Sequence, residues 1–207
     1  MYIHPLNKWE DEPEIVDFIR KNSFATLISQ VKGKPWATHL PIVLGKNKSG
    51  EAVLSGHMAK ANPQWKSIAE NEEVLVIFQG PHAYISSSWY NHENVPTWNY
   101  LAVHVYGKTR LIEGEELLDH LKSLTNTHEE GRPNRVSVET MTESYLARQL
   151  KGLVGFEIKI EEVKSSAKLS QNRDDVNYQH IIEKLEESEF HLDKEVALEM
   201  KKRRRKS

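Results

Sequence analysis

Short runs of β-branched and aromatic residues, separated by glycine-containing turns, are the feature that most constrains how this chain folds. Residues 24–58 read FATLISQVKGKPWATHLPIVLGKNKSGEAVLSGHM, with the turn segments KGK and GKNKSGE between the runs. Runs of this length that are joined by short glycine-containing turns are typical of β-hairpins. The segment therefore predicts three antiparallel strands that follow one another directly.

Three later segments also predict strands. Residues 73–80 (EVLVIFQG) form an apolar run, and residues 153–170 return to a β-rich pattern. Residues 100–112 alternate, which places Leu101, Val103 and Val105 on one face of a strand and Ala102, His104 and Tyr106 on the other. Because His104 alternates with packing residues, we interpret it as a packing residue rather than a ligand.

Helical patterns fall between these strands, at residues 11–23, 61–71, 114–129 and 142–152. In the second of these, Asn62 is expected to cap the helix and Pro63 to lie in its first turn. Long strands with short helices at their ends predict a mostly β, α+β fold, with an antiparallel barrel that is closed or nearly closed. We expect one domain over residues 1–190 and a helical, basic tail over residues 191–207.

The charge of the chain is distributed unevenly. It has 28 basic and 30 acidic residues, and six of the basic residues lie in the tail, which leaves 22 against 30 in the rest. An acidic body is a poor surface for nucleic acid, so any DNA contact is expected from the tail cations Lys201, Lys202, Arg203, Arg204, Arg205 and Lys206. The alternative is a disordered end that only aids solubility.

Several classes of protein lack their signature in this chain. It has no cysteine, and its ten histidines are scattered singly, so no metal site is predicted. The motifs of α/β-hydrolases, P-loop NTPases, Rossmann folds and zincins are missing. No apolar run is long enough for a membrane helix and no secretory signal is recognisable, so we expect a cytoplasmic protein without a membrane partner.

Two stretches remain as candidate sites. In LSGHMAKANPQW (residues 54–65) a strand runs into a helix beside a lysine and a histidine, which suits a phosphate. An ordinary capped helix with a solvated Lys60 explains the same residues. In GPHAYISSSWYNHENVPTWNY (residues 80–100), aromatic rings and serines are suited to a planar ligand or to a subunit interface.

Four motifs, in this order, resemble the PaiB family of negative transcriptional regulators of sporulation and protease production. They are FATLIS…GKPWATHLPIVL, LSGHMAKANPQW, GPHAYISSSWY…VPTWNY and KLSQNR, and the resemblance extends from Tyr2 to about Leu185. The PaiB family is related to the FMN-binding split barrels, which include pyridoxamine phosphate oxidase. The resemblance implies a split β-barrel and a homodimer that binds FMN in a groove between its subunits.

The resemblance also implies which residues contact FMN. The phosphate and ribityl chain would be held by Thr38, His39, His57, Lys60 and Asn62, with Lys60 as the point charge. The partner subunit would place residues of the aromatic stretch near the ring, namely Trp98, Asn99 and Tyr100, with Ser86 and Ser87 as further candidates. Lys168 and Gln171 of KLSQNR would lie near the same groove.

Three functions remain open from the sequence. The first is a PaiB-type regulator, which would not itself be an enzyme. The second is an FMN-dependent oxidoreductase that acts on a small molecule, because flavin chemistry needs few catalytic side chains. The third is a cofactor-free dimeric interaction module, because a fold does not define a function.

Overall fold

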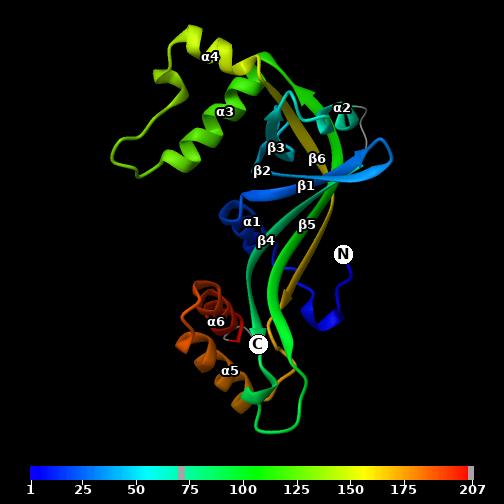
Figure 1. The fold of residues 1–207 in the computed structure, drawn as a ribbon, viewed down its shortest axis with the longest axis vertical. Helices are drawn as coiled ribbons and strands as arrows, with labels where there is room; N and C mark the ends of the chain where they lie inside the picture. Colours follow the sequence, from blue (N-terminus) through cyan, green and yellow to red (C-terminus); the bar gives the residue numbers. More distant parts are fainter. Residues whose placement is uncertain (70–72, 205–207) are drawn as a thin grey trace. The chain divides into compact units, whose positions relative to one another are not determined.

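The computed structural model of the protein describes residues 1–69 and 73–204 (Figure 1). Its six strands form a closed antiparallel barrel in the order β1-β2-β3-β6-β5-β4. The strands are β1 (Phe24–Val31), β2 (Lys34–Lys46), β3 (Ala52–Ala59), β4 (Glu73–Ile85), β5 (Thr97–Ile112) and β6 (Leu153–Lys168). The mostly β fold with flanking helices is therefore confirmed.

Helices occupy the connections and the two ends of the chain. They are α1 (Glu12–Lys21), α2 (Gln64–Ile68), α3 (Gly114–Glu129), α4 (Glu143–Leu150), α5 (Asp175–Glu187) and α6 (His191–Arg204), with 3-10 turns η1 (Pro5–Asn7), η2 (Ser87–Trp89) and η3 (Val138–Thr140). The four helical patterns of the sequence are all present. Helix α5, which the sequence analysis did not predict, begins where the Asp174 side chain accepts a hydrogen bond from the Asn177 N–H at 3.0 Å.

Contacts divide the chain into two compact units, and each is built from several segments. Unit 1 comprises residues 1–18, 79–103 and 164–207, and unit 2 comprises residues 19–78 and 104–163. Strands β4, β5 and β6 each contribute residues to both units. The expected boundary at residue 190 falls between α5 and α6 and stays a prediction.

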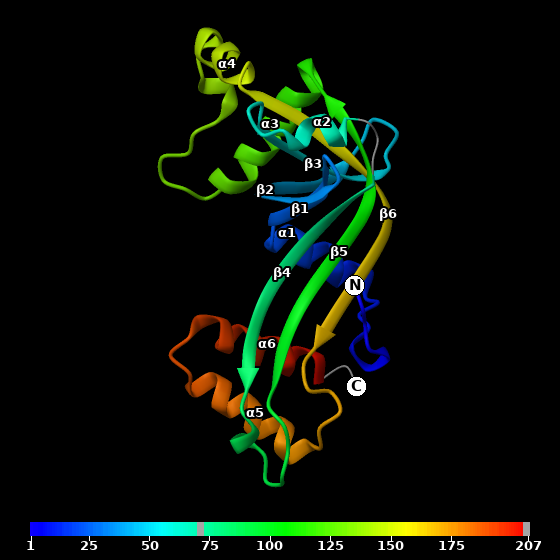
Figure 2. The same ribbon diagram turned by 45° about the vertical axis from the view of Figure 1, so that its right-hand side comes forward.

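Unit 2 contains the hairpins that the sequence predicted (Figure 2). Strands β1 and β2 are joined through Lys32 and Gly33, whose φ angles are 52° and 73°. Positive φ at both central residues is the requirement of a type I′ turn, which explains the glycine of KGK. The core of the unit is formed by fully buried side chains of all six strands, among them Leu27, Ile42, Leu54, Phe78, Val105, Phe156 and Ile158.

Gly107 lies at a close approach between the neighbouring strands β5 and β6 in unit 2. A Cβ atom at this position on β5 would collide with the carbonyl oxygen of Lys159 on β6, and it would lie 2.9 Å from the Ile158 side chain. A backbone carbonyl cannot rotate away as a side chain can. The barrel therefore needs a residue without a side chain at this position.

We expect Gly107→Ala to lower the free energy of unfolding by about 1–3 kcal/mol, because the added methyl group forces two paired strands apart. Gly45→Ala on β2 is the matched control, since nothing lies within 4 Å of a Cβ at that glycine. Urea unfolding followed by tryptophan fluorescence measures both. Equal stabilities for the two variants would contradict the close approach of β5 and β6.

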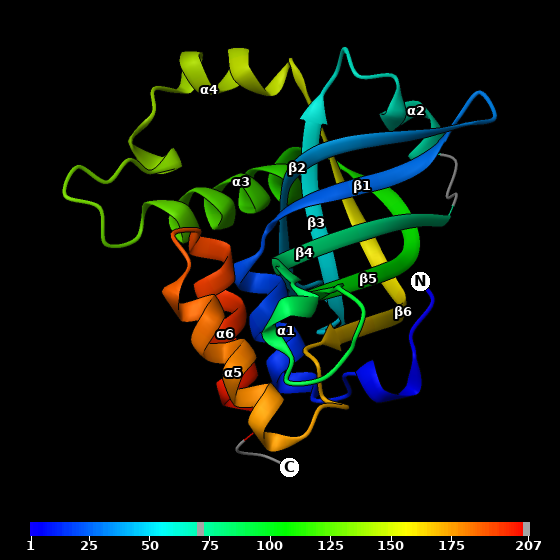
Figure 3. The same ribbon diagram turned by 60° about the horizontal axis from the view of Figure 1, so that its bottom comes forward.

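Unit 1 contains the start of α1, the outer parts of β4, β5 and β6, and helices α5 and α6, which lie side by side (Figure 3). Ile181, Leu185, Val196 and Met200 are buried between these elements. The Tyr178 hydroxyl donates to the Met200 carbonyl at 2.9 Å, which ties the end of α6 to α5. Trp9 packs edge-on against Phe18, with 5.3 Å between the ring centroids.

The basic tail is helical and paired within unit 1 as far as Arg204. Lys201 pairs with Glu186, Lys202 and Arg203 pair with Glu14, and Arg204 pairs with Asp175. Two of the guanidinium groups also lie over aromatic rings, Arg203 over Trp9 and Arg204 over Tyr178, each 4.3 Å from the ring centroid. The alternative of a disordered end is therefore wrong for residues 201–204, while Arg205 and Lys206 lie outside the described residues.

Over the described ranges 1–69 and 73–204, no helix has the length and apolar character that a membrane crossing requires.

Candidate ligand site

The predicted site residues fall into two groups, one in each unit. Thr38, His39, His57, Lys60 and Asn62 belong to unit 2, and Ser86, Ser87, Trp98, Asn99, Tyr100, Lys168 and Gln171 belong to unit 1. The surroundings of each group show which side chains are already engaged and which are available to a ligand.

In unit 2, Thr38 and Asn62 belong to a network centred on the buried Gln64. The Thr38 hydroxyl donates to Gln64 Oε1 at 2.5 Å and accepts from Asn62 Nδ2 at 2.9 Å. Gln64 Nε2 in turn donates to Ser29 Oγ at 3.1 Å. These bonds satisfy polar groups at the barrel surface, so the two predicted residues have a structural role beside any contact with a ligand.

At the junction between β3 and α2, the N-terminus of the short helix offers little to an anion. Helix α2 spans Gln64–Ile68, its N-cap residue is Pro63 rather than Asn62, and Asn62 Oδ1 already accepts the Gln64 N–H at 3.1 Å. The Lys60 N–H donates to the Gly152 carbonyl at 2.8 Å. Only the Lys60 ammonium group is left for an anion here, and its role as the phosphate contact stays a prediction.

His39 and His57 lie in different surroundings. The His39 ring stacks on the exposed Phe24, with 6.4 Å between centroids, and its Nδ1 lies 3.0 Å from Thr26 Oγ1. His57 Nδ1 lies 3.1 Å from His120 Nε2, and His120 Nδ1 lies 3.0 Å from Ser55 Oγ. Burial lowers the pKa of His57, and burial together with the nearby His57 lowers the pKa of His120 to about 4. Both rings are therefore neutral at pH 7.

The neutral histidine pair predicts a pH-dependent stability. Between the unfolded pKa of about 6.5 and the lowered folded values, the unfolded chain binds more protons than the folded chain. The contribution of the neutral histidine pair to the free energy of unfolding is thus complete above pH 6.5 and is lost toward pH 4. We expect stability to fall by up to about 1.4 kcal/mol per pH unit for each extra proton. Urea unfolding at pH 7.5 and 5.0 should show that the free energy of unfolding falls less in His120→Gln than in the unchanged protein. Equal losses in the two proteins would contradict the assignment of the pH dependence to the histidine pair.

In unit 1, Trp98 is the centre of an exposed aromatic cluster. Its ring lies 6.1 Å from His82 and 5.8 Å from Tyr84, centroid to centroid, and 52% of the residue is exposed. The sequence analysis placed residues 80–100 in the wall of a pocket. In the structure, β4 ends within these residues, at Ile85, and β5 begins within them, at Thr97. Trp98 therefore stands on a strand, with its neighbours held in register.

Other predicted residues of unit 1 support the fold directly. Asn99 is fully buried, where its Oδ1 accepts from Ser170 Oγ at 3.0 Å and its Nδ2 lies 3.5 Å from Met200 Sδ. This burial gives Asn99 a structural role beside Ser170, and its predicted place near a flavin ring stays a prediction. Ser86 accepts the Ser88 N–H at 3.2 Å, and η2 begins at Ser87.

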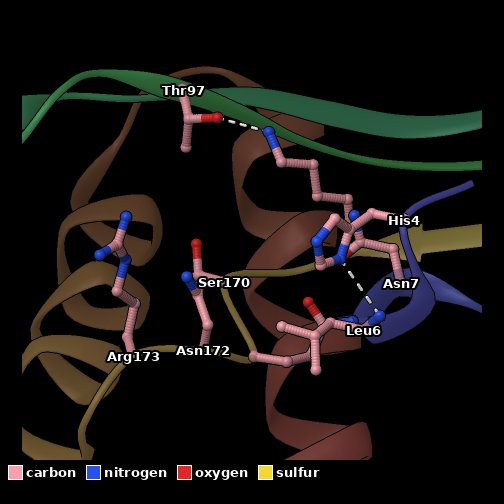
Figure 4. A pocket seen from close by; sticks show the side chains of 9 residues that line it. His4, Leu6, Asn7, Thr97, Ser170, Asn172 and Arg173 are labelled. Atoms are coloured by element: carbon pink, nitrogen blue, oxygen red, sulfur yellow. Dashed lines mark hydrogen bonds between the residues drawn. The ribbon is translucent and has the colours of Figure 1, made fainter.

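A cavity of about 260 Å³ lies in unit 1 beside the loop that follows β6 (Figure 4). Three segments line it, the N-terminal turn, the start of β5 and the loop, with the residues His4, Leu6, Asn7, Thr97, Lys168, Ser170, Gln171, Asn172 and Arg173. The lining residues that the structure describes include two cations, Lys168 and Arg173, and no carboxylate. We call it the Lys168–Arg173 pocket.

The loop holds the two cations in place through its own hydrogen bonds. Gln171 Oε1 accepts the Leu169 N–H at 2.7 Å, and Gln171 Nε2 donates to the Ala167 carbonyl. Ser170 takes a left-handed conformation, with φ at 60°, which costs free energy for a residue with a side chain. Gln171 thus braces the loop, and its predicted place near a ligand stays a prediction.

The electrostatics of the Lys168–Arg173 pocket favour an anion. Burial and the positive charge of Arg173 both lower the pKa of Lys168. Lys168 Nζ donates to Thr97 Oγ1, while the guanidinium of Arg173 makes a long contact of 3.5 Å to Asn94 Oδ1 and lies 4.9 Å from the centroid of the Tyr90 ring. A bound anion would stabilise both charges, because it supplies the negative partner that the lining lacks.

The sequence analysis missed most of this pocket. Ser170 and Arg173 lie within the KLSQNR motif and were signalled by it, although only Lys168 and Gln171 were chosen. Thr97 lies within the VPTWNY motif but was not chosen, and His4 and Asn7 carried no local signal, because they reach the pocket only through the tertiary structure.

The fold of this protein is that of a split β-barrel, and two solved structures show the likeness. The FAD and heme binding protein of Mycobacterium smegmatis superimposes with a TM-score of 0.63 over 84% of this chain and 78% of that one, at 15% identity. The flavocytochrome Anf3 of Azotobacter vinelandii gives 0.63 over 84% and 75%, also at 15% identity. At such low identity the likeness establishes the split-barrel fold alone.

Sequence comparison then identifies the family. The model described as "Putative FMN-binding domain" matches residues 1–162. Protease synthase and sporulation protein PAI 2 of Bacillus subtilis (strain 168) is 46% identical over 197 residues, which cover 95% of this chain and 95% of that protein. The chain belongs to this FMN-binding-domain family, the PaiB family, as its motifs indicated.

Proposed function

We propose that this protein is an FMN-binding, dimeric regulator of the PaiB type that represses sporulation and extracellular protease production. The observation that carries the flavin part is the Lys168–Arg173 pocket, in which two cations face a cavity without a carboxylate. The regulatory part is supported by the 46% identity to PAI 2 over nearly the whole chain.

The chemistry of the pocket matches a phosphate group. Arg173 supplies a planar guanidinium and Lys168 a point charge, the two side chains that most often hold phosphate oxygens. Hydroxyl groups of Thr97 and Ser170 lie in the same lining. A phosphate and the adjoining ribityl carbons suit a cavity of about 260 Å³, whereas the three-ring flavin needs a further surface.

A second copy of the chain is proposed to supply that further surface. Thr97 lines the pocket, and neighbouring residues of a strand point to opposite faces, so Trp98 points away from the face that bears Thr97. The exposed Trp98 cluster of one copy is therefore suited to cover a flavin bound to the other copy. Large exposed aromatic side chains are common in such interfaces.

Measurements of FMN binding by variants can show whether the Lys168–Arg173 pocket or the junction between β3 and α2 at Lys60 holds the phosphate. We expect Lys168→Met and Arg173→Met each to weaken FMN binding about 10- to 100-fold, since each removes a charged hydrogen bond of about 1.5–3 kcal/mol. Lys60→Met is the matched control and should retain FMN. Flavin absorbance after gel filtration measures retention, and light scattering on the same column should give the mass of two chains.

The other outcomes have clear consequences. Loss of flavin from Lys60→Met, with retention in the two pocket variants, would move the phosphate to the junction of β3 and α2. No retained flavin in the unchanged protein would leave a cofactor-free dimeric module. Steady oxidation of NAD(P)H by the flavin-loaded protein would favour the oxidoreductase instead.

Regulation can be tested in Bacillus subtilis that lacks its PAI 2. We expect the unchanged chain to lower extracellular protease activity in that strain, and Arg173→Met to do so less, if flavin controls the regulator. The four described tail cations are paired with carboxylates, so a DNA contact would have to compete with these pairs. Unchanged protease activity on expression of the chain would contradict the proposed regulation.

A further inference from the structure

Unit 2 contains a second cavity whose chemistry differs from that of the Lys168–Arg173 pocket. It has a volume of about 470 Å³ and is lined by residues from the end of β5, the start of β6 and the helices α3 and α4 that connect these strands. Its walls are mainly apolar and include Leu111, Leu117, Ala147, Leu150, Leu153 and Val154. We call it the α3–α4 pocket.

Helix α4 leaves its apolar side uncovered over this pocket. Ala147 and Leu150 lie three residues apart, on one face of the helix, and both line the cavity. No residue of α4 is buried, and Ala147 is exposed. A helix of eight residues is too short to be stable alone in water, so an apolar occupant of the cavity would supply contacts that α4 lacks.

The charges at the α3–α4 pocket favour one negative charge on the occupant. Among the residues that the structure describes, Lys60 and Lys151 line the cavity together with one carboxylate, Glu113. The net charge of these lining residues is +1, in contrast to the two cations that no described carboxylate opposes in the Lys168–Arg173 pocket. Lys151 is solvent-exposed, so its ammonium group is accessible at the rim.

The shape of the cavity depends on residues that do not carry charge. The Trp65 Nε1–H donates to the Lys60 carbonyl at 2.9 Å, which fixes the indole that forms part of the wall. A Cβ at Gly155 would lie 2.6 Å from Leu117 and 2.8 Å from Ile112, so a larger residue there would displace the wall. A volume of about 470 Å³ is within the range of about 300–1,000 Å³ that is usual for small-molecule sites.

We propose that the α3–α4 pocket binds a small apolar monocarboxylic acid, with its hydrocarbon part against α4 and its carboxylate toward Lys60 and Lys151. A phosphate ester carries about two charges and suits the lining less well, and an uncharged hydrocarbon leaves both ammonium groups unmatched. The ligand orders α4 when it binds. The site does not depend on flavin occupancy of the other pocket.

Decanoate is the probe for isothermal titration calorimetry, with decanol and decyl phosphate as matched ligands of the same chain length. We expect decanoate to bind at least tenfold more tightly than either. Lys151→Met should weaken decanoate about tenfold, Lys151→Arg should restore it, and Ala147→Phe should abolish it by filling the cavity. Hydrogen exchange in residues 143–150 should slow when decanoate binds.

Flavin retention in Lys151→Met and Ala147→Phe should equal that of the unchanged protein, which separates this site from the proposed FMN site. The proposal is overturned if decanoate does not bind, if decanol binds equally well, or if Lys151→Met has no effect. It is also overturned if saturating FMN competes with decanoate, because the cavity would then belong to the flavin.

Discussion

Closure of the barrel is the constraint on which the rest of the structure depends. In the order β1-β2-β3-β6-β5-β4, each strand has a neighbour on both sides, so the hydrogen-bonding groups of the backbone are satisfied within the ring. The close approach of β5 and β6 at Gly107 is a consequence of this closure. Helices are then accommodated in the connections, as α2 is between β3 and β4 and as α3 and α4 are between β5 and β6, or before the first strand and after the last, as α1, α5 and α6 are.

The segments that connect the strands and helices also form the two candidate binding sites. The Lys168–Arg173 pocket lies where the chain leaves β6, and its lining depends on a loop that is held by Gln171 and by the strained Ser170. The α3–α4 pocket lies where β5 and β6 are joined by helices instead of a tight turn. Both sites are thus formed in part by connecting segments, which often carry the functional residues of a protein.

The two pockets differ in the charges of their lining residues, so the ligands proposed for them differ. One has two cations, polar side chains and no carboxylate, which suits a phosphate. The other has apolar walls and a net charge of +1, which suits a monocarboxylate. A regulator that binds a flavin and an acid at separate sites would respond to two chemical signals. The C-terminal cations, in contrast, are used to hold α6 against α1 and α5.

The sequence by itself determined the strands, most of the helices and the family, because turn residues, side-chain alternation and motifs are local properties. The hairpins of residues 24–58 and the buried face of Leu101, Val103 and Val105 are examples. Only the tertiary structure decided that Asn99 is buried, that Arg203 pairs with Glu14 across 189 positions, and that Thr97 meets Lys168 across 71. Such contacts depend on the path of the whole chain through space, and no periodicity within a short segment encodes that path.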